Sequence, residues 1–101
     1  MKLTNKDKDI LINKLTDNLP VLRAKLRVSQ KEVSTIIGIS RQTYSAIETR
    51  KRKMSWNTFL SLMFYFIVNE ETAKMMDTMG ILTVELNDFL TKSSKTSTLS
   101  R

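Results

Sequence analysis

The sequence predicts an all-helical fold, and three observations support this. Of the 101 residues only two are glycine and one is proline, and no stretch alternates apolar and polar residues for the length of a strand. Apolar residues instead recur every three or four positions, as on one face of a helix. The length suits one small domain with short extensions, because the 41% hydrophobic content can fill one core and not two.

The first helical region carries a single apolar stripe with members three or four positions apart. These members are Leu11, Leu15, Leu19, Leu22 and Leu26. Pro20 interrupts the pattern, because proline suits the first turn of a helix and breaks its interior. Two arrangements fit the region: a helix over about 5–16 followed by a second one starting near Asn18 or Leu19, or one kinked continuous helix.

Serine residues mark the starts of the next three helices, because a serine hydroxyl can accept a hydrogen bond from the free amides of a first turn. These caps are Ser29, Ser40 and Ser55. The helices that they begin are predicted to cover about 30–37, 41–48 and 56–68. Gly38 ends the first of the three, since glycine readily takes the left-handed conformation that closes a helix.

Acidic residues mark a fifth helix, predicted from Asn69 to about Met79 and closed by Gly80. Glu70 and Glu71 favour its first turn, where the helix dipole is positive. Thr83 is expected to cap a last helix. The apolar face of that helix consists of Leu82, Leu86, Phe89 and Leu90. The residues beyond 91 have almost no apolar side chains and are predicted to be disordered.

Positive charge is concentrated in one segment of the chain. The net charge is +7, and residues 23–53 alone contain nine Lys or Arg against two Glu, which accounts for the whole excess. A concentrated excess favours a polyanionic partner, whereas a dispersed one only aids solubility. Ordinary solvated surface charge is the alternative interpretation of this segment.

Several function classes lack their usual residues. The chain has no cysteine and no histidine, so we expect no disulfide, no metal site, no cofactor and no enzymatic activity. The longest apolar run, at 62–68, has seven residues, whereas a membrane span needs roughly 20. No signal peptide is apparent, and we expect a cytoplasmic protein with no membrane partner.

The two short helices around Gly38 carry the most specific pattern. Ser34 is small where the helices would cross, and a tight turn joins them. The residues expected to face inward are Val33, Ile37, Ile39 and Ile47. The pair lies in SQKEVSTIIGISRQTYSAIE, preceded by LRAKLRV and followed, after Thr49, by RKRKMSWNTFLSLMFYF.

This segment resembles the DNA-binding domain of the phage repressor and Cro type (XRE-like) helix-turn-helix family. The resemblance covers about 19–68 and extends weakly to 79. It implies a compact five-helix domain that is usually dimeric, with the third helix in the major groove of double-stranded DNA. The flanks lie outside the resemblance. We therefore expect an amino-terminal helical extension at 1–17, a DNA-binding domain at 18–79, a carboxy-terminal helix for packing or dimerisation at 80–91, and a disordered tail at 92–101.

The resemblance places base contacts along the third helix. The candidates are Ser40, Arg41, Gln42, Thr43, Ser45 and Ala46. The Arg41 guanidinium can bind guanine O6 and N7, and the Gln42 amide can bind adenine N6 and N7. Ser45 and Ala46 lie one turn further on and could touch a thymine methyl group or a sugar. The alternative for these residues is a solvated helix face.

Phosphate contacts are expected on both sides of the third helix. The candidates are Gln30, Lys31, Tyr44, Arg50, Lys51, Arg52 and Lys53. Gln30 opens the second helix, where the resemblance implies a contact through the side chain and the helix amides. The basic residues at 50–53 can bind phosphates without a defined geometry, because such contacts need only a positive charge and a long side chain. Tyr44 is expected to pack in the core with its hydroxyl on the DNA side.

Four further positions concern the structure. Arg23 and Glu48 match positions that form a partly buried ion pair in some members of the family. Arg50 stands near the position where glycine or asparagine often ends the third helix, and Met54 replaces a frequent proline.

These features predict a sequence-specific, double-stranded DNA-binding transcriptional regulator, a repressor, that acts as a homodimer. The alternative is an antitoxin-like module whose apolar carboxy-terminal half binds a protein partner while the helix-turn-helix regulates its own gene. The fourth helix has more apolar residues than one small core can hold. The excess is therefore covered either within the chain or by a second subunit.

Overall fold

Five helices and a further helical segment make up the computed structural model, which describes residues 3–83 and 85–91. The helices are α1 (Asn5–Leu26), α2 (Gln30–Ile37), α3 (Arg41–Glu48), α4 (Trp56–Val68) and α5 (Glu70–Thr78). The further segment covers 85–91, and no strand occurs in this part of the chain. The all-helical prediction is therefore confirmed. The predicted tail at 92–101 lies outside the described residues.

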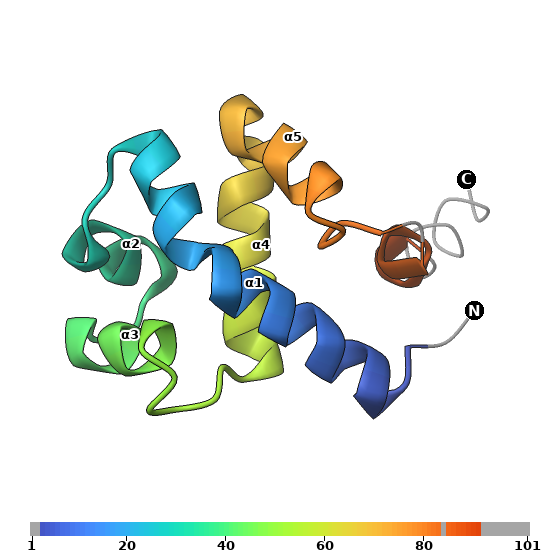
Figure 1. Ribbon diagram of the computed structural model, residues 1–101, viewed down its shortest axis with the longest axis horizontal. Helices are drawn as coiled ribbons and strands as arrows, with labels where there is room; N and C mark the ends of the chain where they lie inside the picture. The colour runs from blue at the N-terminus through green and yellow to red at the C-terminus, as the bar shows by residue number, and fades with distance from the viewer. Residues whose placement is uncertain (1–2, 84, 92–101) are drawn as a thin grey trace, which may run out of the picture.

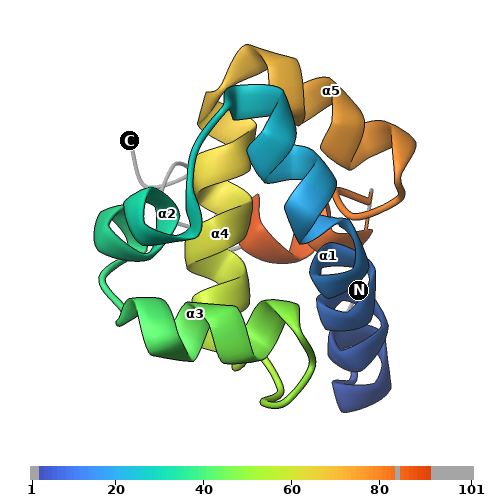
Figure 2. The same cartoon turned by 60° about the vertical axis from the view of Figure 1, so that its left-hand side comes forward.

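α1 crosses the whole molecule and contacts α3, α4 and α5 (Figure 1). α2 and α3 lie one above the other at one end, and α4 runs past both of them (Figure 2). The start of α1 and the segment 85–91 lie at the other end (Figure 1). Within 3–83 and 85–91, no helix is long and apolar enough to cross a bilayer.

α1 continues through Pro20, so the continuous one of the two expected arrangements is present. Proline inside a helix removes one backbone hydrogen bond and costs about 3 kcal/mol. Each fully buried leucine stabilises the fold by about 1.5–3 kcal/mol, so the buried leucine stripe outweighs that cost. The stripe consists of Leu11, Leu15, Leu19 and Leu22. The expected extension at 1–17 and the start of the expected domain at 18–79 thus share one helix.

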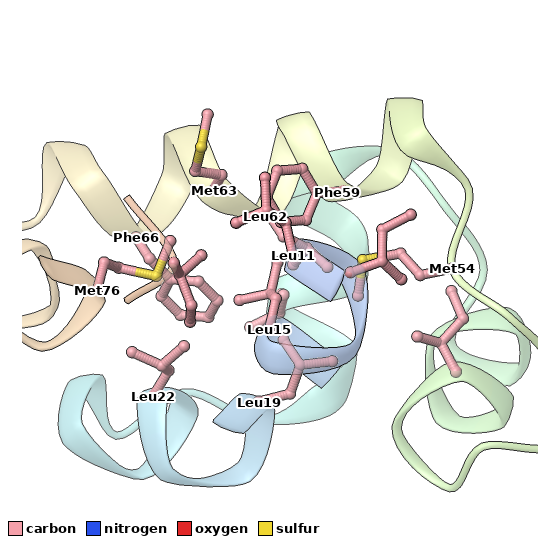
Figure 3. Packing of buried hydrophobic residues seen from close by; sticks show 14 of the residues in the cluster. Leu11, Leu15, Leu19, Leu22, Met54, Phe59, Leu62, Met63, Phe66 and Met76 are labelled. Carbon is pink, nitrogen blue, oxygen red and sulfur yellow. The ribbon is translucent and has the colours of Figure 1, made fainter. Parts of the chain in front are cut away.

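The core forms where the leucine stripe of α1 meets α4 and α5 (Figure 3). Phe59, Leu62 and Phe66 of α4 are fully buried against it. Met54, in the position where the family often has proline, is also a core residue. The chain after α4 closes the core from the far side through Met76, Ile81 and Leu86, which are fully buried.

The predicted serine caps are confirmed. Ser29, Ser40 and Ser55 each accept a hydrogen bond from the backbone amide three residues later, at 3.0–3.1 Å. Thr83 caps the segment 85–91 in the same way, because its hydroxyl accepts from the amide of Leu86 at 3.1 Å. Local hydrogen bonds therefore start these helices where the sequence places them.

One buried carboxylate joins the first three helices. Glu48 of α3 accepts two hydrogen bonds from Arg23 of α1, at 2.9 and 3.0 Å. It also accepts one from the Gln30 amide of α2 at 2.9 Å and one from the Tyr44 hydroxyl at 2.8 Å. The side chains of Arg23 and Glu48 are only 19% and 8% exposed. This ion pair therefore connects α1, α2 and α3 around a shared acceptor.

The pKa values of these groups follow from the same contacts. Burial alone would raise the pKa of Glu48, but the hydrogen bonds from Arg23, Gln30 and Tyr44 outweigh it and hold the pKa below its ordinary value. The hydrogen bond to Glu48 raises the pKa of Arg23. Burial, together with Glu48, raises the pKa of Tyr44. The carboxylate is thus charged and the phenol is a donor at neutral pH.

We expect Arg23→Ala to lower the free energy of unfolding by about 3 kcal/mol, because it leaves the carboxylate of Glu48 buried without its cation. Thermal and urea unfolding measure the loss. Lys25→Ala on the exposed side of α1 is the control and should change the free energy by no more than about 0.5 kcal/mol. An unchanged melting temperature for Arg23→Ala would contradict a structural role of the pair.

Acid should weaken the fold through Glu48. Its folded pKa lies below the ordinary value of 4.5, so its stabilising contribution is complete above that pH and is lost as the pH falls through the folded pKa. Urea titrations between neutral pH and about pH 2 measure this loss. Glu48→Gln should be less stable at neutral pH and should lose less on acidification. The same acid-induced loss in both proteins would assign it to other carboxylates, such as Asp7 and Glu32, whose pKa values are lowered by hydrogen bonds from Thr4 and Ser29.

Candidate nucleic-acid interface

A tight turn at 38–40 joins α2 to α3. The amides of Gly38 and Ile39 both donate to the carbonyl of Ser34, at 2.9 and 3.0 Å, and Gly38 has a φ of 83°. Val33 and Ile47, on the two helices, are buried. The inner face of α3 is therefore docked on the domain, and its outer face is left to solvent.

The outer face of α3 borders a shallow groove of about 270 Å³. Its lining consists of Arg41, Gln42, Ser45, Ala46, Thr49 and Lys51. Four of these were predicted as base contacts and Lys51 as a phosphate contact. α3 thus brings donors, acceptors, a small apolar side chain and two cations to one open surface.

Thr49 belongs to this surface, although the sequence reasoning missed it. It follows Ser45 by four residues, which is the helical spacing of neighbours on one face. This spacing is the sequence feature from which Thr49 could have been predicted. Its hydroxyl donates to the Ser45 carbonyl at 2.8 Å, which leaves the oxygen free to accept a further hydrogen bond.

Ser40 and Thr43, also predicted as base contacts, lie outside this groove. The Ser40 hydroxyl accepts from the amide of Thr43 at 3.0 Å and donates to the Thr43 hydroxyl at 2.9 Å. Both hydroxyls therefore serve the start of α3. Ser40 remains exposed and Thr43 half-buried.

The predicted phosphate contact of Tyr44 is wrong. Its side chain is 0% exposed, and its hydroxyl donates to Glu48 inside the protein rather than pointing outward. The physical reason is that the buried carboxylate needs donors, and the phenol supplies one. The core-packing half of the prediction agrees with the observed burial.

The start of α2 offers a second anion-binding feature. The side-chain nitrogen of Gln30 donates to Glu48, which leaves its second hydrogen available to an anion together with the backbone amides at the start of α2 that Ser29 does not cap. Lys31 beside it is exposed. Glu32 closes the capping box with Ser29 and puts a carboxylate on the same turn.

The loop from α3 to α4 divides its four cations into two pairs. Arg50 points to α1, where its guanidinium contacts the carboxylate of Asp17, and Lys53 donates to Asp9 at 2.7 Å. Lys51 and Arg52 are exposed and form no ion pair within the described residues. The structure therefore leaves two of these cations open to an anionic ligand and engages the other two internally.

Arg50 also explains the departure from the family pattern at the end of α3. It has a φ of 64°, the left-handed conformation that glycine or asparagine usually supplies. A residue with a Cβ atom adopts it at a cost of about 1–2 kcal/mol. The arginine thus adopts the left-handed backbone and adds a side chain that reaches α1.

Within the described residues, no group of three or more histidine, cysteine, aspartate or glutamate side chains could hold a metal ion. The chemistry available at the outer face of α3 is hydrogen bonding and charge.

Comparison with known proteins agrees with this geometry. The sequence model of a family described as helix-turn-helix matches residues 22–55, from the last turn of α1 to the cap of α4. No curated protein and no solved structure matches the chain. The match supports a DNA-binding helix-turn-helix regulator. Over residues 22–55, about a third of its length, the chain is therefore similar to that helix-turn-helix family.

Proposed function

We propose that this protein is a sequence-specific, double-stranded DNA-binding transcriptional regulator that acts as a repressor and places α3 in the major groove. The observation that carries the proposal is the open outer face of α3. There Arg41 and Gln42, which can each read a base edge bidentately, lie beside Lys51 in the segment that holds the whole charge excess. Bound across a promoter, the protein would exclude other DNA-binding proteins.

The proposed contacts fall into two classes. Arg41 and Gln42 read guanine and adenine, and the smaller residues further along α3 contact thymine methyl groups or sugars. Lys31, Lys51, Arg52 and the first amides of α2 bind phosphates, which positions α3 without reading sequence. Specificity and affinity therefore reside in different residues, and mutation can separate them.

We propose further that the protein binds as a homodimer through an apolar surface on α2 and α4. Phe64 is 67%, Val68 60% and Ile36 57% exposed. They line one groove of about 410 Å³ with Ile37, Ser61 and Tyr65. The lining contains no Lys, Arg, Asp or Glu, so two highly basic chains can approach here without direct repulsion. A protruding Phe64 beside a groove also suits a two-fold interface, in which each copy offers both.

The same apolar surface supports the alternative of an antitoxin-like protein. A protein partner could cover Phe64 and Val68 in place of a second copy, while α3 still binds DNA at the protein's own gene. Large exposed apolar patches mark protein interfaces without specifying the partner. A stoichiometric partner that co-purifies with a single chain would favour this alternative.

We expect the protein to select defined duplexes from a random pool and to bind them with an affinity that falls steeply with salt. A dimer that neutralises roughly 6–10 phosphates should show a slope of log K against log salt of about −0.9 per phosphate. The selected site should contain two half-sites about 34 Å apart. A flat salt response, or equal affinity for all duplexes, would contradict the proposed function.

Three alanine variants separate the proposed roles in the same assay. Arg41→Ala and Gln42→Ala should each cost about 1–3 kcal/mol on the selected site and relax the preference at one base pair. Lys51→Ala should weaken all duplexes alike and reduce the salt slope by about one. Lys25→Ala, which removes an exposed charge on α1, is the control for total charge.

We expect sedimentation equilibrium at micromolar concentration to give the mass of two chains. Phe64→Glu should reduce it to one chain, because it puts a carboxylate into the apolar surface. Val21→Glu is the matched control, since Val21 is 51% exposed on α1 and lies outside this surface. A single-chain mass for the unaltered protein, or a dimer that survives Phe64→Glu, would contradict this interface.

A further inference from the structure

One face of α1 presents three polar residues to the basic loop. Asp9, Asn13 and Asp17 follow one another at intervals of four, so they share one face of α1. Arg50 donates to the side-chain and main-chain oxygens of Asn13, each at 3.3 Å, and pairs with Asp17. Lys53 pairs with Asp9 at 2.7 Å. Both ends of the basic stretch are thus attached to a helix that the family match does not include at these positions.

The two attached residues, Arg50 and Lys53, flank in the sequence Lys51 and Arg52, the two cations left unpaired within the described residues. The amides of Lys51 and Arg52, between the attached ends, both donate to the carbonyl of Ala46, at 2.8 and 3.1 Å. The Lys51 side chain lines the same groove as Arg41 and Gln42. The Ala46 carbonyl thus holds the backbone of Lys51 and Arg52 near α3, while Arg50 and Lys53 hold the loop on either side of them against α1.

The negative charges of Asp9 and Asp17 have two opposite effects on DNA binding. Carboxylates beside a DNA-binding surface repel phosphates, so by charge alone they weaken binding. Each exposed pair contributes only about 0–1 kcal/mol to folding stability. The pairs do, however, order the loop before binding, and a loop that is already ordered loses less conformational entropy when the ligand binds.

We propose that Asp9, Asn13 and Asp17 are positioning residues of the DNA interface. Through Arg50 and Lys53 they hold the loop 49–54 so that Lys51 and Arg52 meet phosphates next to the bases read by α3. Arg50 and Lys53 are then internal anchors of the loop rather than phosphate contacts. This inference rests on the proposed DNA-binding function and adds one polar face of α1 to its machinery.

The test compares duplex affinity for Asp17→Ala and Asp77→Ala. Both variants remove one exposed carboxylate and raise the net charge equally, but Asp77 lies on α5, away from the loop. Charge alone predicts unchanged or tighter binding for both. The positioning role predicts that Asp17→Ala binds every duplex about three- to ten-fold more weakly, with an unchanged salt slope, while Asp77→Ala does not. Asp17→Glu, which keeps a carboxylate within reach of Arg50, should restore binding.

A second variant separates an anchor from a phosphate contact. Arg50→Gly keeps the left-handed backbone, which glycine adopts without strain, and removes the side chain with its guanidinium. If Arg50 is an anchor, Arg50→Gly, Asp17→Ala and the double variant lose affinity to a similar extent, because all three release the same loop. If Arg50 binds phosphate, Arg50→Gly lowers the salt slope by about 0.9 and Asp17→Ala binds more tightly, which overturns the inference.

The outcomes also distinguish this inference from the proposed function. Thermal unfolding of each variant first verifies that the exposed substitutions leave the fold intact. Should the unaltered protein bind no duplex, the proposed function fails and the inference falls with it. Should the unaltered protein bind with steep salt dependence and Asp17→Ala bind as tightly or tighter, the inference alone is overturned.

Discussion

The carboxylate of Glu48 is the interaction on which the arrangement of the first three helices depends. It accepts four hydrogen bonds, which come from α1, α2 and α3. The Glu48 side chain is only 8% exposed, and its buried negative charge is stabilised because each carboxylate oxygen accepts hydrogen bonds. Since Glu48 is the last residue of α3, this acceptor sets how α3 lies on the domain. The outer face of α3 is open because its inner face is held in this way.

α1 serves two purposes through two of its faces. Its leucine stripe fills the core against α4 (Figure 3). The free energy gained by this burial outweighs the cost of Pro20 inside the helix. Its polar face, with Asp9 and Asp17, holds the loop after α3. One long helix thereby links the packing of the domain to the path of the basic loop. The amino-terminal extension is integral to the fold rather than an appendage.

Local chemistry explains why most of the fold could be predicted. Helix caps and apolar spacing depend only on residues a few positions apart, so they can be predicted from the sequence. The same holds for the left-handed Gly38 that ends α2. Four residues of the groove on α3 were among the predicted base contacts, and that prediction came from the resemblance to a helix-turn-helix family. Tyr44 was misjudged because an aromatic hydroxyl can face in or out, and the deciding partner, Glu48, depends on how α3 is docked.

The sequence by itself determined the helical class, the helix starts, the helix-turn-helix and the segment that holds the excess charge. Each of these depends on residue type and short spacing. Only the tertiary structure decided whether α1 passes Pro20, which cations stay free and which are paired, and where Arg50 points. Those outcomes depend on contacts between residues more than 30 positions apart, such as Arg50 with Asp17, or on the net balance between core burial and a local cost. Neither can be read from neighbours in the chain.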